Sequence, residues 1–409
     1  MYKLHTHCRA CGYGKAGAQG IKSAPAAKLI EVLDLGRQPL ANDFCREDEE
    51  RAGCAPLKVL FCPNCSLAQL SVTVRPDILY RHYAYVTSPS ETMRLHFEQL
   101  IQDIARESAG RSVLEIGSND GRLLALMQEK GYTVSGVDPA ENLAAIARKS
   151  GIPTRTAFFG LQSALCIPPA DIVIARHVFC HVSDWQDFVR GLESVSHPET
   201  LILIETPYVG DLLANCEFDT IYHEHLSYLS LKAVRTLLTN SNLHLHRILR
   251  YPIHGGAILL MLRRNSSKAP PHKSVAEFKE KITREQWYQC AIKSYNLMAD
   301  LQKEIKSSKS LDLTVAALGA SAKSTVWINA CGFTRKDIAF IADNTPGKQW
   351  RTSPGTDIPI VDEGAILREL PDYVVMFCWN YKEEVLKKFA LARSKCVKFL
   401  IPVPTLTVV

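Results

Sequence analysis

The sequence lacks the long apolar runs and the one-sided charge that identify several classes of protein. Its 409 residues contain no stretch of about eighteen apolar residues, so we expect no membrane-spanning helix. The first residues lack the apolar core of a signal peptide, which favours a cytoplasmic protein. A net charge of +6 is spread without a long basic block. Nucleic acid is therefore not an expected partner, although this balance suits an anionic substrate such as a sugar nucleotide.

Cysteine, by contrast, is plentiful, and four of the thirteen cysteines form two close pairs. Without a secretion signal the thiols are expected to be reduced, and paired cysteines then more often bind metal than form disulfides. The pairs Cys8–Cys11 and Cys62–Cys65 each lie in a turn-forming sequence. Together they supply the four sulfur ligands of a tetrahedral zinc ion, which leaves no open position and predicts a structural metal. The alternative is four unconnected buried cysteines. Two spare candidates lie between the pairs, at Cys45 and Cys54.

Three stretches of different character indicate three units, at 1–75, 76–268 and 269–409. The middle unit begins with a tyrosine-rich segment and an expected helix at 90–108. Short apolar strands then alternate with helical patterns, and this βαβ rhythm predicts a parallel sheet covered by helices. The expected strands are 112–116, 133–137, 171–175 and 201–205.

The last unit starts after two prolines with one long expected helix at 274–307, whose apolar residues recur at helical intervals. A second strand–loop–helix pattern follows at 313–324, and further strands are expected at 338–342, 373–377 and 397–401. The predicted fold class is therefore α/β. It comprises an N-terminal zinc-binding module, a central Rossmann-like domain and a C-terminal Rossmann-like α/β domain.

A glycine-containing loop after the first strand of the central domain predicts the binding site of a methyl donor. The loop 117–121 runs into a helix at 122–130, whose free N–H groups suit a ligand. Asp138 ends the next strand about twenty residues later, where a carboxylate can accept hydrogen bonds from ribose hydroxyls. The loop lacks the third glycine of a dinucleotide site, and Glu115 precedes it as in class I methyltransferases, which favours S-adenosylmethionine (SAM). The candidate cofactor-binding residues are Glu115, Gly117, Ser118, Asn119, Asp120, Gly121, Asp138, Pro139 and Phe158. Phe158 and Phe159 equally suit a role as core aromatics.

The segment Tyr222-His223-Glu224-His225 concentrates groups that transfer protons. A histidine has an unperturbed pKa of about 6.5 and can act as a base near neutrality. A tyrosine can donate a hydrogen bond to a developing oxyanion, and a glutamate can hold an imidazole in one tautomer. The spacing does not match the zinc motif HExxH. Structural roles for the two histidines are the alternative.

Two further histidines, His177 and His181, follow the expected strand 171–175. Catalytic loops of a parallel sheet emerge at this edge, although each histidine also suits packing or capping.

Ten motifs then occur in order along nearly the whole chain. They are Cys-Arg-x-Cys-Gly, Leu-Asp-Leu-Gly-Arg-Gln-Pro-Leu-Ala-Asn-Asp-Phe (33–44), Cys-Pro-x-Cys, Leu-Glu-Ile-Gly-Ser-Asn-Asp-Gly, Cys180-His181-Val182, Tyr-His-Glu-His, His-Gly-Gly (254–256), Gly-Ala-Ser-Ala-Lys, Ser-Pro-Gly-Thr-Asp-Ile-Pro-Ile (353–360) and Trp379-Asn380-Tyr381. This ordered set resembles the sugar C-methyltransferases that act on nucleotide-linked keto-deoxysugars. The resemblance implies a SAM-dependent monomer that methylates a dTDP- or GDP-linked 4-keto-6-deoxyhexose at C3.

The resemblance also implies roles for the proton-transfer residues. The C4 ketone acidifies the hydrogen on C3, a base removes it, and the enolate carbon attacks the SAM methyl group. His225 is then the expected base, Tyr222 and Glu224 position the base or the enediolate oxygens, and His181 lines the same pocket. Tyr83 or Tyr85 resembles the tyrosine segment that closes over the site.

The C-terminal domain becomes the expected holder of the nucleotide. Lys323 follows a glycine-rich turn and is expected to pair with the pyrophosphate. The candidate substrate-binding residues are Lys323, Ser321, Lys348, Asn380 and Tyr381. After its His-Gly-Gly motif the chain has Ala-Ile-Leu where the family commonly has Ser-Leu-Arg, which leaves the nucleotide and sugar open. O- or N-methylation of a small metabolite is the first alternative function, and a zinc-knuckle methyltransferase of nucleic acid is the second.

Overall fold

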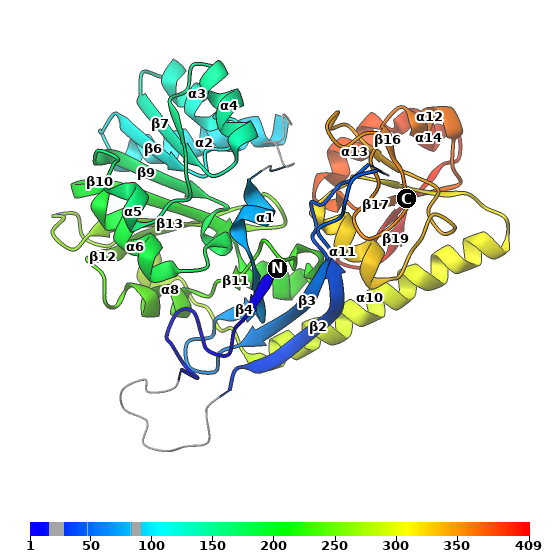
Figure 1. The fold of residues 1–409 in the computed structure, drawn as a ribbon, viewed down its shortest axis with the longest axis horizontal. Helices are drawn as coiled ribbons and strands as arrows, with labels where there is room; N and C mark the ends of the chain where they lie inside the picture. Colours follow the sequence, from blue (N-terminus) through cyan, green and yellow to red (C-terminus); the bar gives the residue numbers. More distant parts are fainter. Residues whose placement is uncertain (16–27, 47, 82, 84–90) are drawn as a thin grey trace.

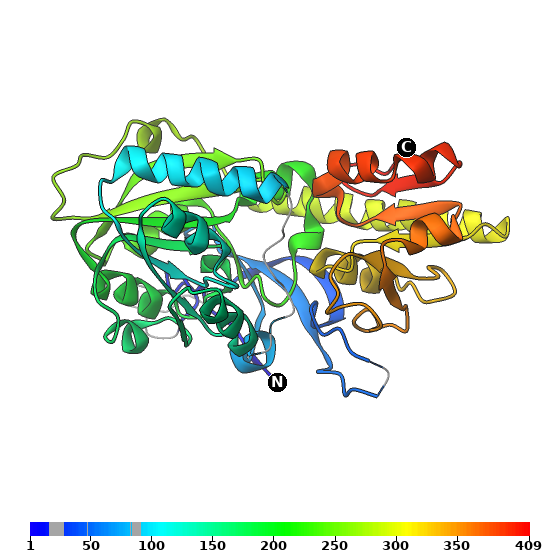
Figure 2. The same ribbon diagram turned by 90° about the horizontal axis from the view of Figure 1, so that it is seen from above.

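The computed structural model describes residues 1–15, 28–46, 48–81, 83 and 91–409. Figure 1 shows two α/β lobes, the central domain and the C-terminal domain, with the N-terminal sheet below and between them. In Figure 2, seen from above, the same sheet again lies between the lobes. Residues from the two lobes and from the sheet can therefore meet along one seam.

The N-terminal sheet is antiparallel and has the order β11-β4-β3-β2. Its strands are β2 (Ile30–Pro39), β3 (Cys54–Phe61), β4 (Ala68–Leu70) and β11 (Ser227–Tyr228). In β3 every second residue, from Ala55 to Phe61, is buried, as expected for a strand with one face on a core. β11 comes from the central part of the chain, because it directly follows the Tyr-His-Glu-His segment. A smaller ribbon pairs β1 (Tyr2–Leu4) with β5 (Val72–Val74).

The central sheet has seven strands in the order β12-β13-β10-β9-β6-β7-β8. They are β6 (Ser112–Ile116), β7 (Thr133–Asp138), β8 (Thr154–Thr156), β9 (Ala170–Arg176), β10 (Ser196–Pro207), β12 (Leu243–Tyr251) and β13 (Ala257–Arg264). The first five pair in parallel, and the last two are antiparallel additions. All four strands predicted for this domain are present. Helices that flank these strands include α2 (Glu91–Glu107), α3 (Arg122–Glu129), α4 (Glu141–Lys149), α5 (Leu161–Ala164) and α6 (Trp185–Ser194).

The strand order reverses between β6 and β9, because the chain leaves β6 toward β7 and returns on the other side at β9. Open parallel sheets bind ligands at such a switch point, outside the carboxyl ends of the strands. The predicted donor loop follows β6, and His177 follows β9, so both lie at this switch point.

The C-terminal sheet has a second switch point of the same kind. Its order is β16-β15-β14-β17-β18-β19, with only β19 antiparallel. The strands are β14 (Val315–Leu318), β15 (Ile341–Asp343), β16 (Ile360–Asp362), β17 (Tyr373–Met376), β18 (Lys398–Ile401) and β19 (Thr407–Val408). The reversal lies between β14 and β17. α11 (Ala322–Ala330) begins after β14, and the short helix η3 (Trp379–Tyr381) follows β17, so both start at this point.

The single helix predicted at 274–307 is wrong, because the structure has two helices separated by a break. A single turn, α9 (Ser274–Glu277), is separated from α10 (Arg284–Ser310) by six non-helical residues, 278–283. Thr283 begins the second helix with a capping box, in which its side chain accepts the Gln286 N–H and its own N–H donates to the Gln286 side chain. The expected strand at 338–342 begins only at Ile341. No helix in the described ranges is both long and apolar enough to cross a membrane.

Candidate active site and metal centre

Four cysteine thiols from the N-terminal module converge on one point. The Sγ atoms of Cys8, Cys11, Cys62 and Cys65 all lie within 4.8 Å of one another. The closest pairs are Cys8–Cys65 at 3.5 Å and Cys11–Cys62 at 3.6 Å. A zinc ion with Zn–S bonds of about 2.3 Å places its sulfur ligands roughly 3.8 Å apart, so the four thiols fit a closed tetrahedral site. The spare cysteines, Cys45 and Cys54, do not join this cluster.

The backbone of the donor loop, 117–121, lies close to the loop that follows β9. Gly117 has a φ of +68°, and a Cβ atom there would lie 2.2 Å from Cγ2 of Val178. Asp138 accepts the Asn119 N–H with one oxygen and the Ala140 N–H with the other, both at 2.8 Å. These bonds shape the loop into a cradle, and burial raises the pKa of Asp138. The carboxylate, the close backbone and the helix start of α3 suit a nucleoside such as that of SAM.

Other predicted donor residues differ in what they contact. Glu115 is fully buried and accepts hydrogen bonds from Arg176 at 2.8 and 3.0 Å, which leaves its Oε2 without a partner among the described residues. Phe159 packs edge-on against Phe188, whereas Phe158 is 49% exposed. Phe159 is therefore a core residue, and Phe158 stays available to a ligand. Its ring lies 6.5 Å from that of Tyr80.

His225 has its two ring nitrogens held in one tautomer. Nδ1 lies 2.7 Å from the carbonyl oxygen of Thr220, and Nε2 lies 2.7 Å from the hydroxyl of Tyr222. A carbonyl can only accept, so Nδ1 carries the proton and donates it, and the Nε2 lone pair accepts from Tyr222. Burial lowers the pKa of His225 well below its usual value, so the imidazole is neutral. The ring is fixed by Thr220 and not by Glu224, contrary to one role suggested by the sequence.

Glu224 instead faces the N-terminal module. Its Oε2 accepts the hydroxyl of Tyr83 at 2.6 Å, and its Oε1 accepts the side-chain amide of Asn42 at 2.7 Å. Burial raises the pKa of Glu224 to about 7, and the two hydrogen bonds oppose this rise. Tyr85, the other predicted tyrosine, lies outside the described residues. His223 is a buried structural residue, because its Nε2 lies 3.3 Å from the Pro56 carbonyl.

His181 lies beside His225, as the sequence predicts. It ends η1 (Phe179–His181), and the two imidazole centroids are 5.2 Å apart. Tyr80 stacks on the ring of His181, with 5.6 Å between the ring centroids. Burial lowers the pKa of His181 to about 3, and its Nε2 has no hydrogen-bond partner among the described residues. A neutral imidazole with one uncommitted nitrogen next to His225 suits contact with a ligand.

The C-terminal domain brings a cation toward this cluster. Lys323, in the first turn of α11, has its Nζ 3.9 Å from the ring centre of Trp379. This Nζ is buried and has no hydrogen-bond partner among the described residues. The charge of Lys323 also contributes to lowering the pKa of His225 and His254, so it faces the histidines. His254 in turn lies 4.9 Å from His177 and 6.5 Å from Tyr381, measured between ring centres.

The remaining predicted substrate residues divide into two groups. Ser321 caps α11 by accepting the Ser324 N–H, and Asn380 lies in η3 beside Tyr381. Lys348 is different, because its buried Nζ donates to the Ala320 carbonyl at 2.8 Å and thereby holds the turn before α11. Lys348 therefore supports the loop, and its ammonium group is already engaged.

Sequence reasoning did not single out three residues that the structure places beside the cluster, namely Asn42, Tyr80 and Asp219. Asp219 is fully buried, and its Oδ2 accepts the indole N–H groups of Trp327 at 3.0 Å and Trp379 at 2.7 Å. The sequence signals were the position of Asn42 within the motif at 33–44 and that of Tyr80 within the tyrosine-rich segment. The contacts themselves join residues more than a hundred positions apart, which no local pattern reveals.

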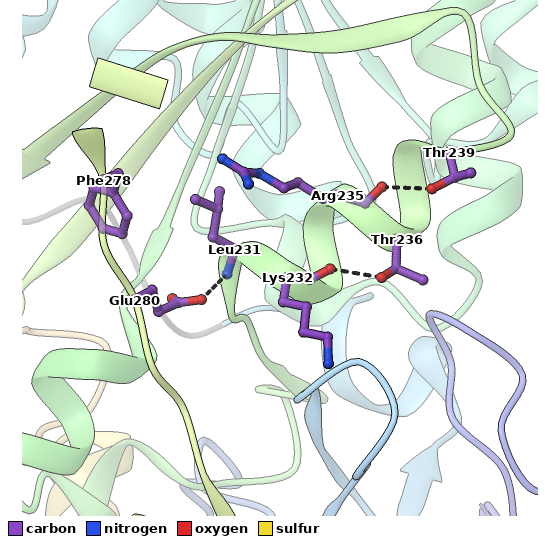
Figure 3. Close-up of a pocket in the computed structure, with 7 residues that line it drawn as sticks. All are labelled: Leu231, Lys232, Arg235, Thr236, Thr239, Phe278 and Glu280. Atoms are coloured by element: carbon purple, nitrogen blue, oxygen red, sulfur yellow. Dashed lines mark hydrogen bonds between the residues drawn. The ribbon is translucent and has the colours of Figure 1, made fainter. Parts of the chain in front are cut away.

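One surface cavity of about 290 Å³ lies away from these groups. Figure 3 shows it on α8 (Leu231–Leu238), with Glu280 accepting the Leu231 N–H at 2.7 Å. Its lining contains none of the predicted site residues.

The fold and the two sites define a class I methyltransferase that carries a cysteine-ligated metal module. Family models agree, matching a methyltransferase domain at 90–248, a zinc-binding domain at 25–80 and a C-methyltransferase C-terminal domain at 252–404. The chain is 30% identical to the C-methyltransferase NovU of Streptomyces niveus, over 97% of this chain and 95% of the relative. The chain thus belongs to the C-methyltransferase family, and the predicted fold class and enzyme class are confirmed.

Part of the chain is also similar to solved structures. One is the magnesium protoporphyrin IX methyltransferase of Synechocystis PCC 6803 with bound SAH, at 14% identity and a TM-score of 0.35. That match covers 42% of this chain and 83% of the other.

The cysteine cluster predicts a zinc stoichiometry that one substitution should abolish. We expect purified protein to carry one zinc ion per chain and Cys62→Ser to carry almost none, because three thiolates bind far more weakly than four. The N-terminal module should then melt at a much lower temperature. Elemental analysis and thermal unfolding measure both. Cys166→Ser, at an exposed cysteine outside the cluster, is the matched control. Unchanged zinc in Cys62→Ser would contradict the assignment.

Proposed function

We propose that this enzyme transfers a methyl group from SAM to C3 of a nucleotide-linked 4-keto-6-deoxyhexose. The observation that carries the proposal is the tautomer of His225, in which the unprotonated Nε2 accepts the Tyr222 hydroxyl and can accept a proton when a substrate takes that hydroxyl's place. A carbon acid next to a ketone needs such a base, whereas the family membership supplies the C-methylation class. The keto-sugar is supported by the resemblance of the motifs and by the cationic residue at the seam.

The steps follow from the groups at the site. His225 Nε2 accepts the C3 proton, and the C–H electrons form an enolate with the C4 oxygen. Tyr222, whose hydroxyl lies against Nε2 in the free enzyme, is placed to donate to that oxygen. When bound, SAM supplies an electrophilic methyl group, which the C3 carbanion takes as the sulfonium becomes a neutral thioether. The proton on His225 then returns to water, and the imidazole is neutral again.

Burial of this site sets the protonation state of the proposed base. Desolvation lowers the pKa of His225, so the imidazole is neutral and can accept a proton, but the same desolvation makes it a weaker base than a histidine in water. His181 and Tyr80 form an aromatic wall beside it. The donor loop and His177 lie at the same switch point of the central sheet, so donor and acceptor can meet there.

The first test follows hydrogen exchange at C3. We expect incubation with a dTDP- or GDP-linked 4-keto-6-deoxyhexose in D₂O to introduce deuterium at C3 without SAM, and a methyl group at C3 with SAM. His225→Asn should lose both by at least about a hundredfold, since general-base catalysis contributes roughly 10²–10⁴-fold. NMR and mass spectrometry locate the label.

The matched control is His197→Asn, because His197 pairs with Asp171 at the opposite, amino edge of the sheet. A methyl group found on oxygen or nitrogen would contradict C-methylation. Exchange that persists in His225→Asn would contradict the role of His225.

Lys323 is proposed to bind the negatively charged part of the nucleotide sugar. Lys323→Met keeps an unbranched side chain of similar length but removes the charge that lies over the Trp379 ring. We expect KM for the sugar nucleotide to rise about 10- to 100-fold, which corresponds to losing one charged hydrogen bond. SAM affinity, measured by calorimetry, should not change. Lys336→Met, at an exposed lysine, is the control. An unchanged KM would remove Lys323 from the binding site.

A further inference from the structure

The proton-transfer segment is held from outside its own domain. The residues that follow it form β11, which pairs with β4 of the N-terminal sheet through Ser227–Gln69 and Tyr228–Ala68. The Leu226 carbonyl accepts the Arg9 guanidinium at 2.6 Å and the Leu70 N–H at 3.0 Å. Arg9 lies between two of the cysteine ligands. The cysteine module therefore fixes the backbone immediately after His225.

Asn42 reaches the same segment from the turn after β2. The turn is short, with the Asp43 N–H donating to the Leu40 carbonyl at 3.1 Å. The Ala41 carbonyl accepts the Thr325 hydroxyl of α11 at 3.0 Å, so the C-terminal domain supports the turn from behind. The Asn42 side chain projects from this supported turn to Glu224.

Two neutral donors thus form hydrogen bonds with one buried carboxyl group. Asn42 and Tyr83 each donate to a different oxygen of Glu224, at 2.7 and 2.6 Å. The Tyr80 hydroxyl donates to the main-chain carbonyl of Glu224 at 3.3 Å. An amide N–H₂ can only donate, so this arrangement matches an ionised carboxylate, which only accepts.

We propose that Asn42 is a positioning residue, which keeps Glu224 as an oriented anion whose remaining lone pairs accept a hydroxyl group of the sugar substrate. This inference rests on the proposed function for the identity of the substrate. It assigns to the N-terminal module a part in the reaction, beyond binding a structural metal. Asn42 acts only through Glu224 and does not touch the reacting atoms.

The titration of Glu224 can be followed, because the ionisable groups that face it keep their charge near neutrality. Burial raises its pKa to about 7, and the bonds from Tyr83 and Asn42 oppose that rise. The facing Tyr80 and Tyr83 have pKa values raised well above 10, and burial raises that of Cys180 to about 12. None of these three changes charge near neutrality. Loss of the Asn42 donor removes a bond that favours the anion, so the pKa of Glu224 should rise further.

The test compares pH profiles of kcat for wild type and Asn42→Ala. If the carboxylate is the active form, kcat rises with pH through the Glu224 pKa. We expect this rising limb of the profile to shift to higher pH by about one unit in Asn42→Ala, because one charged hydrogen bond is lost. At pH 7 kcat should then fall roughly fivefold, because the ionised fraction of Glu224 drops from about one half to about one tenth, and at pH 9 it should recover. Glu224→Gln should remove the limb. SAM affinity should stay unchanged.

Thr325→Val is the matched control, because it removes the support of the Ala41 carbonyl and leaves the amide–carboxylate bond in place. Any loss of kcat in Thr325→Val should be equal at all pH values. Buried Glu115 and Glu217 also have pKa values of about 7, so the difference between variants, and not the limb alone, identifies Glu224.

Infrared titration gives a readout that does not depend on turnover. The carboxylic acid C=O band that disappears in Glu224→Gln reports the protonation of Glu224 in the free enzyme, and we expect its midpoint to rise in Asn42→Ala. A uniform loss of kcat with an unmoved band would overturn the proposal. If wild type does not methylate the keto-sugar, the proposed function fails, yet the band still tests Asn42.

Discussion

The proton-transfer segment, Tyr222–His225, is held at both ends by other parts of the chain. These are the C-terminal domain before it and the N-terminal sheet after it. At one end Asp219 accepts two indole N–H groups from the C-terminal domain, and the next residue, Thr220, fixes the proton of His225. At the other end Leu226 and β11 join the N-terminal sheet. The residues between these anchors form no regular helix or strand, so their own hydrogen bonds cannot fix the side-chain directions. The two anchors do so instead.

Burial acts in opposite directions on the two central ionisable groups. It lowers the pKa of His225 and raises that of Glu224, since both shifts disfavour charge in a dry site. The shift keeps the imidazole of His225, the proposed base, neutral, and it also weakens its basicity. The effect on Glu224 works against an anion, and the hydrogen bonds from Tyr83 and Asn42 counter it. The same environment therefore leaves the imidazole neutral unaided, whereas an ionised Glu224 requires the added donors.

Much of the architecture could be predicted because it is encoded locally. β9 has a continuous apolar run, as expected for a strand covered on both faces, and the two cysteine pairs have the spacing of metal-binding turns. The interruption before α10 was missed, because Phe278 and Ile282 keep the helical spacing while the backbone between them is not helical. Lys348 was expected to face a ligand, but only the folded loop shows that the Ala320 carbonyl takes its ammonium group.

The partners of the proton-transfer residues could not be predicted for a different reason. Asn42 and Glu224 are 182 positions apart, and Asp219 and Trp379 are 160 apart. Each contact arises from how distant parts of the chain meet in the folded protein, and sequence periodicity carries no information about that.

The same fact explains why a closed metal site can matter to chemistry without taking part in it. Four thiolates leave a zinc ion no position for a substrate. Arg9, between Cys8 and Cys11, nevertheless donates to the carbonyl that directly follows His225 in the chain. The metal site fixes the turn that carries Arg9, the Arg9 side chain holds the Leu226 carbonyl, and Leu226 directly follows the imidazole that we propose as the base. The structural ion and the proposed chemistry are thus joined through one side-chain hydrogen bond and short stretches of backbone.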